Sequence, residues 1–132
     1  MTTTPNALRL DRVGQIALQV RDIERAVAFY RDSLGVPFLF TAPPGLAFFR
    51  CGDLSLMLST PESDAEPHRA STSAIYFQVD DVHAAHAALR DRGVSFIGAP
   101  HVVHRAPDFE LWMAFFRDPD ENMLVVMERK PI

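Results

Sequence analysis

A chain of 132 residues with a formal net charge of −4 fits a single globular domain, and it can bury a core without disulfides or a structural metal. Apolar residues make up 48% of the chain and charged residues 23%, an ordinary balance for a globular protein. The negative charge argues against nucleic acid or an anionic membrane surface as the main partner.

The single cysteine, Cys51, excludes an internal disulfide and fits a reducing compartment. The first residues, MTTTPNALRLDR, do not resemble a secretory signal, because no positively charged start leads into an apolar stretch. No apolar run approaches the roughly 20 residues that a membrane-spanning helix needs. We therefore expect a cytoplasmic protein that has no membrane partner.

Residues 13–20 alternate between apolar and polar side chains, which predicts a strand with one apolar face. Asp22 then provides an N-cap, and apolar residues at helical spacing predict a helix that stops at Gly35. Three short strands follow, at residues 38–41, 46–50 and 54–59. Since Gly52-Asp53 supplies a hairpin turn between the last two, the first unit is β-α-β-β-β.

The same order returns after a polar linker at about residues 61–73. A strand at 74–79 leads into a helix that is capped by Asp80 or Asp81 and stopped by Gly93. The remaining strands are predicted at residues 94–97, 111–116 and 123–127. The strand and helix repeat at an offset of 59, and the tetrapeptide Ala-Phe-Phe-Arg repeats at an offset of 67. We expect one domain, residues 1–132, with modules at about 11–60 and 74–129.

Two such modules predict an α+β fold with eight strands, in which each helix covers one face of its own four-stranded sheet. The opposite faces carry polar, aromatic and methionine side chains, which is typical of a cavity wall. We expect eight residues to bind a ligand there: Gln15, Gln19, Met57, Tyr76, Gln78, His104, Trp112 and Met123.

The duplicated unit and the C-terminal phrase FFRDPDENMLVVME, residues 115–128, resemble the vicinal oxygen chelate superfamily. That superfamily includes glyoxalase I, methylmalonyl-CoA epimerase, extradiol dioxygenases and bleomycin-resistance proteins. The resemblance covers about residues 13–128. It implies a cup-shaped, partly open eight-stranded mixed sheet, a small-molecule ligand and a homodimer.

The resemblance also implies where a divalent metal would bind, because metal enzymes of the superfamily place one ligand on each of four strands. Those positions hold Gln15, Met57, Ala74 and Val125 in this sequence. Of these, only Gln15 suits a divalent ion, since a thioether is a soft ligand and the alanine and valine side chains have no donor atom. We therefore expect no metal cofactor.

His101 and His104 lie three residues apart, so on a strand they would face opposite sides. A shared ion would need a helical turn, which the flanking Pro100 and Pro107 make unlikely. We therefore favour a loop whose histidines are exposed or structural. The functional alternative is that His104 reaches the mouth of the cavity together with Arg105 and binds a polar ligand group.

The leading hypothesis is a metal-independent protein that binds or sequesters an apolar or partly aromatic compound, as the bleomycin-resistance branch implies. The alternative is a lyase, isomerase or dioxygenase acting on a small oxygenated metabolite, with an unusual ligand set around Gln15, His104 and Glu110. In that case Glu110 would be a general base with a raised pKa. A third alternative is a partner-binding module with a filled cup.

The sequence leaves two roles open for Trp112, which is either part of the core or an aromatic wall of the cavity.

Overall fold

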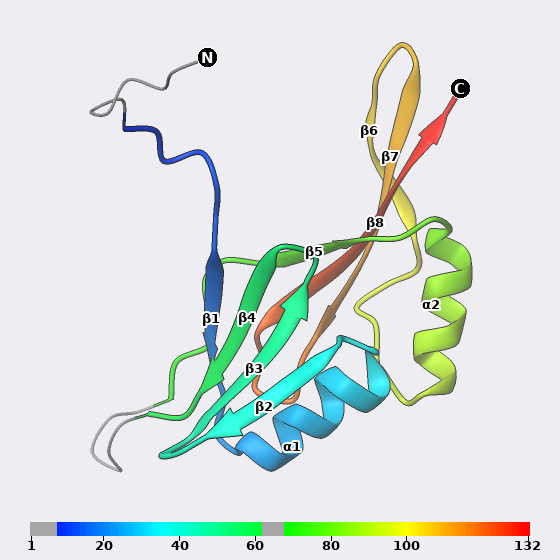
Figure 1. Ribbon diagram of the computed structural model, residues 1–132. Helices are drawn as coiled ribbons and strands as arrows, with labels where there is room; N and C mark the ends of the chain where they lie inside the picture. Colours follow the sequence, from blue (N-terminus) through cyan, green and yellow to red (C-terminus); the bar gives the residue numbers. More distant parts are fainter. Residues whose placement is uncertain (1–7, 62–67) are drawn as a thin grey trace.

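Two four-stranded sheets make up the structure, a computed structural model that describes residues 8–61 and 68–132 (Figure 1). The first module contains β1 (Gln15–Gln19), α1 (Ile23–Ala28), the π-helical segment η1 (Phe29–Ser33), β2 (Phe38–Ala42), β3 (Leu46–Cys51) and β4 (Leu54–Ser59). The second contains β5 (Ile75–Gln78), α2 (Val82–Asp91), β6 (His101–Arg105), β7 (Phe109–Arg117) and β8 (Met123–Pro131). The strand orders are β1-β4-β3-β2 and β5-β8-β7-β6, so the predicted α+β fold of two β-α-β-β-β modules is confirmed.

The strand register shows that the two modules follow one plan. In each sheet the first strand pairs in parallel with the last, and the last pairs in antiparallel with the third. The equivalent positions on these three strands are Ala17, Met57 and Phe48 in one sheet and Tyr76, Val125 and Phe115 in the other. Their offsets are 59 on the first strand, 68 on the last and 67 on the third. The turn between β7 and β8 is therefore one residue longer than the turn between β3 and β4.

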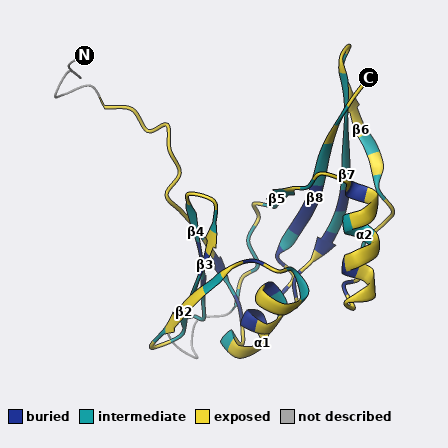
Figure 2. Ribbon diagram, turned by 45° about the vertical axis from the view of Figure 1, so that its right-hand side comes forward, coloured by how far each residue is buried: buried dark blue, intermediate teal, exposed yellow. Residues whose placement is uncertain are grey.

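Each helix covers one face of its own sheet, and the buried residues lie where helix and sheet meet (Figure 2). Both helices begin at the predicted caps: Asp22 accepts a hydrogen bond from the Arg25 N–H at 3.2 Å, and Asp81 accepts one from the Ala84 N–H at 3.0 Å. Within residues 8–61 and 68–132, no helix is long and apolar enough to cross a membrane. The largest fully buried apolar or aromatic side chains are Tyr30, Phe49, Phe116, Leu56, Leu58 and Leu124.

One strand of the second module lies elsewhere than the sequence predicts. The prediction of a strand at residues 94–97 is wrong, because Phe96 makes only an isolated bridge with Phe116. The strand is β6, in the segment for which the sequence favours a loop. Pro100 and Pro107 both lie outside β6, where a missing N–H removes no hydrogen bond from the sheet.

The turn between β7 and β8 joins the second module to the first, and we call residues 118–122 the acidic turn. Its buried Asp118 carboxylate accepts a hydrogen bond at 2.7 Å from the hydroxyl of Tyr30, which lies in η1 and is also buried. The Asn122 side chain donates to the same carboxylate at 2.8 Å, and so does the main-chain N–H of Asp120. The acidic turn is therefore held together internally by the group that contacts the first module.

Asp120 supplies the charged part of this contact. Its fully buried carboxylate accepts hydrogen bonds from the main-chain N–H of Arg21 at 3.0 Å and from the guanidinium of Arg25 at 2.7 Å. Asn122 adds a bond from its side-chain amide to the Gln19 carbonyl at 2.9 Å. Because a buried carboxylate is stable only with such partners, the acidic turn fixes how the second module meets the junction of β1 and α1.

Replacing Tyr30 with phenylalanine should destabilise the fold and remove a dependence on pH. The free energy of unfolding should fall by about 2 kcal/mol near neutral pH, because a buried hydrogen bond to a carboxylate is lost. Burial and the Asp118 charge raise the pKa of Tyr30 well above its ordinary value, so the phenol stays protonated in the folded chain. An unfolded tyrosine loses its proton at about pH 10, so wild-type stability should decline above about pH 10, by up to about 1.4 kcal/mol per pH unit.

Urea unfolding at neutral pH and on both sides of about pH 10 measures both effects. The matched control is Tyr76→Phe, since Tyr76 is 49% exposed and its hydroxyl has no such partner among the described residues. An alkaline decline of unchanged size in Tyr30→Phe would show that a different group is responsible.

Candidate functional site

We call the sheet faces that are turned away from the helices the open faces, and most predicted ligand residues lie on them. On the first sheet, Gln15 and Gln19 of β1 share the open face with Met57 of β4. The Gln15 amide nitrogen contacts the Met57 sulfur at 3.8 Å, the length of a weak hydrogen bond. The structure therefore brings these three predicted residues together on one face.

On the second sheet, the open face carries Tyr76 and Gln78 of β5 and Met123 of β8. His104 of β6 pairs with Leu111, whose side chain belongs to the same face. Four predicted residues are therefore distributed over the open face of the second module.

Trp112 lies on the opposite, helix-facing side of β7. Its ring packs against His83 of α2 with 5.0 Å between ring centroids, and the Lys130 ammonium lies 4.3 Å from the ring centre. The structure therefore does not place Trp112 with the other predicted ligand residues. Strand alternation carries the signal that separates them, because Trp112 has the same parity as the core residues Ala114 and Phe116.

A β-bulge brings His101 and His104 onto the same face of β6. His101 pairs with Met113 and His104 with Leu111, and the register shifts between the two pairs. Since Met113 and Leu111 are two residues apart on β7, they share a face, and so do their partners. The favoured loop is therefore wrong, and so is the argument that on a strand the two histidines would face opposite sides, because the extra residue of the bulge changes the alternation.

The four positions at which the resemblance places metal ligands hold an unsuitable set of side chains. Gln15 contacts the Met57 sulfur, Val125 is completely buried in the sheet, and Ala74 offers no side-chain donor. In the described ranges 8–61 and 68–132, no cluster of three or more His, Cys, Asp or Glu side chains could hold a metal ion. The residues present do not fit a divalent metal at this place.

Glu110 is held as a carboxylate by its neighbours. Arg105 donates to it through Nε at 2.9 Å, and the Trp112 indole donates at 3.1 Å. These hydrogen bonds lower the pKa of Glu110 below its ordinary value, with Arg105 as the main cause. A general base near neutral pH needs a shift in the other direction, so the geometry does not favour that role.

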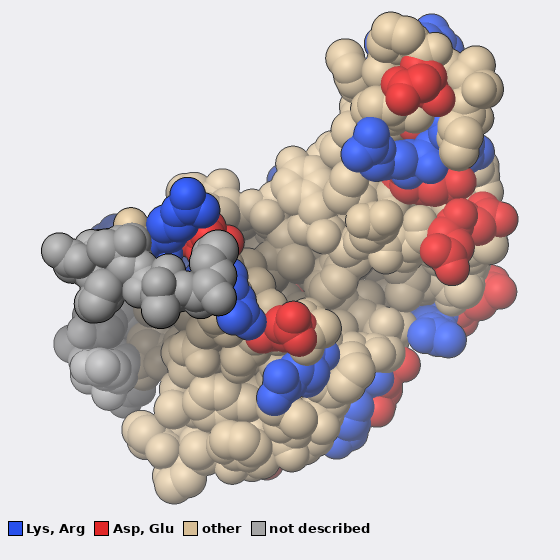
Figure 3. Space-filling model, turned by 45° about the horizontal axis from the view of Figure 1, so that its top comes forward, with Lys and Arg blue, Asp and Glu red and all other residues tan. Residues whose placement is uncertain are grey.

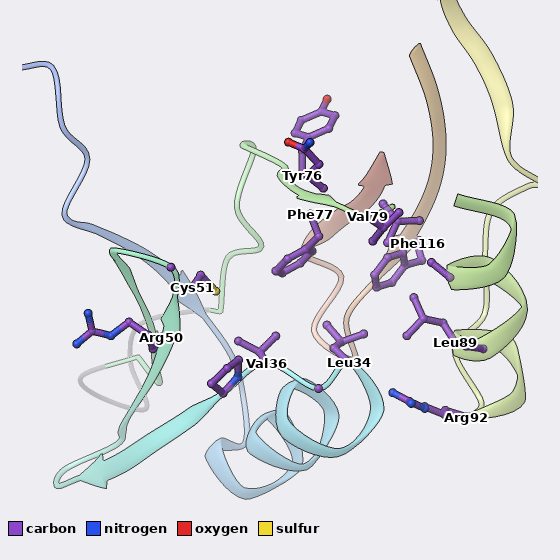
Figure 4. A pocket seen from close by; sticks show the side chains of 17 residues that line it. Leu34, Val36, Arg50, Cys51, Tyr76, Phe77, Val79, Leu89, Arg92 and Phe116 are labelled. Carbon is purple, nitrogen blue, oxygen red and sulfur yellow. The ribbon is translucent and has the colours of Figure 1, made fainter. Parts of the chain in front are cut away.

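A cavity of about 720 Å³ opens between the two modules, and we call it the junction cavity. Its walls come from the segment after η1, the β3–β4 turn, β5 and α2 (Figure 4). Figure 3 shows the hollow between the two lobes, with mainly uncharged atoms inside it and charged side chains around it. Its apolar lining consists of Leu34, Val36, Pro37, Phe77, Val79, Ala85, Ala88, Leu89, Phe116 and Val126.

Few polar groups border the junction cavity. Tyr76, Gln78 and Arg50 border it, but the Tyr76 and Arg50 side chains point away from it (Figure 4). Arg92 donates to the Ser33 carbonyl at 3.1 Å, which ties the end of α2 to the end of η1. Burial raises the pKa of the Cys51 thiol, so this cysteine is protonated at neutral pH and is a poor nucleophile. The cavity therefore offers an apolar interior with polar groups at its edge.

A second hollow of about 570 Å³ lies on the open face of the first sheet, beside Gln19 and Met57. The predicted ligand residues are thus divided, with Tyr76 and Gln78 at the junction cavity and Gln19 and Met57 at the second hollow. The other four border neither of these two hollows: Gln15, His104, Trp112 and Met123.

The sequence does not predict the junction cavity, because helix-facing residues such as Phe77 line it and their spacing is that of core residues.

Comparison with known proteins agrees with this architecture. The model of the Glyoxalase/Bleomycin resistance protein/Dioxygenase superfamily matches residues 12–126. The uncharacterized protein YraH of Bacillus subtilis (strain 168) is 31% identical over 126 residues, which is 85% of this chain and 94% of YraH.

Solved structures share the fold over nearly the whole chain. Lactoylglutathione lyase from Agrobacterium tumefaciens has a TM-score of 0.71 and 27% identity, with 91% of this chain and 95% of that chain covered. An integron cassette protein from the mobile metagenome of V. cholerae has a TM-score of 0.73 and 24% identity, with 92% and 97% covered. The chain belongs to the glyoxalase/bleomycin resistance protein/dioxygenase superfamily.

Proposed function

We propose that the chain binds a small, mainly apolar molecule in the junction cavity without a divalent metal, and that binding itself is its activity. The observation that carries this proposal is the make-up of the cavity, in which both modules supply apolar walls and the edge strand β5 borders it at Tyr76 and Gln78. Ligand sites in proteins commonly have this size and composition. The unsuitable donor set at Gln15, Met57, Ala74 and Val125 supports the metal-independent form.

The substitution Ala88→Trp tests whether the junction cavity is the binding site. Ala88 and Ala87 are both exposed on α2, but only Ala88 lines the cavity. In Ala88→Trp the indole should occupy the cavity and weaken binding of the neutral apolar dye Nile red by about ten-fold, or about 1.4 kcal/mol. Fluorescence titration measures the dissociation constant.

Ala87→Trp is the matched control, because it makes the same change to helix propensity one residue away. It should bind the dye as the wild type does. Equal dye affinity in Ala88→Trp and the wild type would place the dye elsewhere and contradict the proposal.

A second candidate function is an enzyme of the lyase, isomerase or dioxygenase kind, favoured by the 27% identity to a lactoylglutathione lyase. Gln15, His104 and Glu110 would then carry the chemistry. The lowered pKa of Glu110 weighs against this role, since it makes the carboxylate a weaker base.

Removal of divalent metals should leave dye binding unchanged, because no step of binding uses them. The measurement is the Nile red titration after dialysis against EDTA and again after Zn²⁺ or Mn²⁺ is added back. Turnover of lactoylglutathione should be undetectable under both conditions. Turnover that is lost in Gln15→Ala and in His104→Ala, but kept in His101→Ala, would favour the enzyme instead.

We further propose that the protein is a cytoplasmic homodimer in which a second copy covers the open faces of the sheets. Phe40 lies on the open face of the first sheet, is 52% exposed, and stacks beside Phe48 with 4.8 Å between ring centroids. An exposed aromatic ring that packs beside a half-buried one is typical of an interaction surface.

Light scattering should give a mass of twice 14.8 kDa for the wild type. Phe40→Glu should shift the mass toward that of a single chain, because a charge would be buried without a partner in the interface. Ala87→Glu is the control, since Ala87 is exposed on α2, which covers the opposite side of its sheet. A wild type that stays at 14.8 kDa would exclude this dimer.

A further inference from the structure

The outer edge of β1 is occupied by the acidic turn. The Val20 N–H donates to the Ser59 carbonyl of β4 at 2.9 Å, so the main-chain groups of the neighbouring residues point to the other edge. There the Gln19 carbonyl accepts from the Asn122 side chain at 2.9 Å, and the Arg21 N–H donates to Asp120 at 3.0 Å. Side chains of the second module thus provide one donor and one acceptor to the edge of β1.

The edge of β5 has the same geometry. The Val79 N–H donates to the Met127 carbonyl of β8 at 2.9 Å, just as Val20 does to β4. The groups equivalent to those at the edge of β1 are therefore the Gln78 carbonyl and the Asp80 N–H, at the offset of 59. Within the described part of the chain, neither of them has a hydrogen-bond partner.

The length of one turn explains the difference. The β3–β4 turn of the first module is the counterpart of the acidic turn, but it is one residue shorter and places Cys51 and Gly52 where the acidic turn has Asp118 and Pro119. On α2, Leu89 takes the position that corresponds to Tyr30. Cys51, Gly52 and Leu89 all line the junction cavity, which occupies the place that a longer polar turn would fill.

We propose that the edge of β5 and the junction cavity together bind a neutral N-acylated amino-acid amide with an apolar side chain. In a parallel pairing, one residue donates its N–H to a carbonyl of the strand and accepts from the N–H two residues further on, so a single acylated residue matches Gln78 and Asp80. Its apolar side chain would lie against the apolar lining of the cavity. This inference rests on the function proposed above and narrows the class of ligand.

The charge of the site favours a neutral amide over a free acid. Asp80 is exposed beside its own N–H, and the Asp81 carboxylate caps α2 by accepting from the His83 N–H at 3.0 Å. Two arginines line the cavity: Arg92 of α2 already donates to the Ser33 carbonyl, and the Arg50 side chain points away from the cavity (Figure 4). A ligand carboxylate at the edge of β5 would therefore meet two like charges.

Two probes with the same apolar body test the inference. N-acetyl-L-phenylalaninamide carries the required N–H, and its analogue with a methyl group on the acetamide nitrogen does not. The methylated probe should bind about five-fold more weakly, which is the size expected for one lost hydrogen bond. Titrations followed by ¹H–¹⁵N correlation spectra give both affinities, and the Asp80 amide should shift downfield with the first probe.

The outcomes separate this inference from the proposed function. Equal affinity for both probes, or an Asp80 amide that does not shift, overturns the amide inference. If Ala88→Trp still weakens Nile red binding in that case, the junction cavity remains a binding site for ligands of another class. Binding of N-acetyl-L-phenylalaninamide that is unaffected by Ala88→Trp overturns the inference, because the probe would then lie outside the junction cavity.

Discussion

The arrangement of the two modules depends on two carboxylates that are buried where the modules meet. A charge in such a place is stable only while its partners stay in position, because a buried carboxylate without them has lost its hydration and gained nothing in exchange. Asp118 requires the Tyr30 hydroxyl, and Asp120 requires the Arg21 N–H and the Arg25 guanidinium. Because these partners come from η1 and from the start of α1, the acidic turn sets the position of one module against the other.

The other side of the junction is built differently. There Arg92 donates one hydrogen bond across the modules to the Ser33 carbonyl, and the remaining groups are mainly apolar. A polar contact with defined partners therefore faces an apolar cavity across the same interface. This difference within a duplicated fold explains why one junction can give rigidity while the other has room for a ligand.

The sequence predicts the fold well because the same β-α-β-β-β module occurs twice in the chain. Alternation in residues 13–20 and the cap at Asp22 recur at an offset of 59, and the stop at Gly35 recurs at Gly93, at an offset of 58, so each copy supports the interpretation of the other. The exception is β6, because the prediction places that strand at residues 94–97 and favours a loop where β6 lies. The bulge that brings His101 and His104 onto one face also leaves no signal in the sequence, since it depends on pairing with β7.

The site is harder to predict from the sequence, for a physical reason. Asp118 and Asp120 have the pattern of ordinary turn residues, and only their contacts with Tyr30 and Arg25 show that they join the modules. A cavity between modules is lined by residues such as Phe77 and Leu89, whose periodicity is that of core. Periodicity reports which way a side chain points, but not whether the space beyond it is filled.

The two hairpins thus show how one module can be used in two ways within a chain. The β7–β8 turn is one residue longer and carries the polar side chains that join the modules, whereas the shorter β3–β4 turn borders an open cavity. Two copies of one module can therefore diverge through a single surface turn while strand order, register and helix caps stay the same.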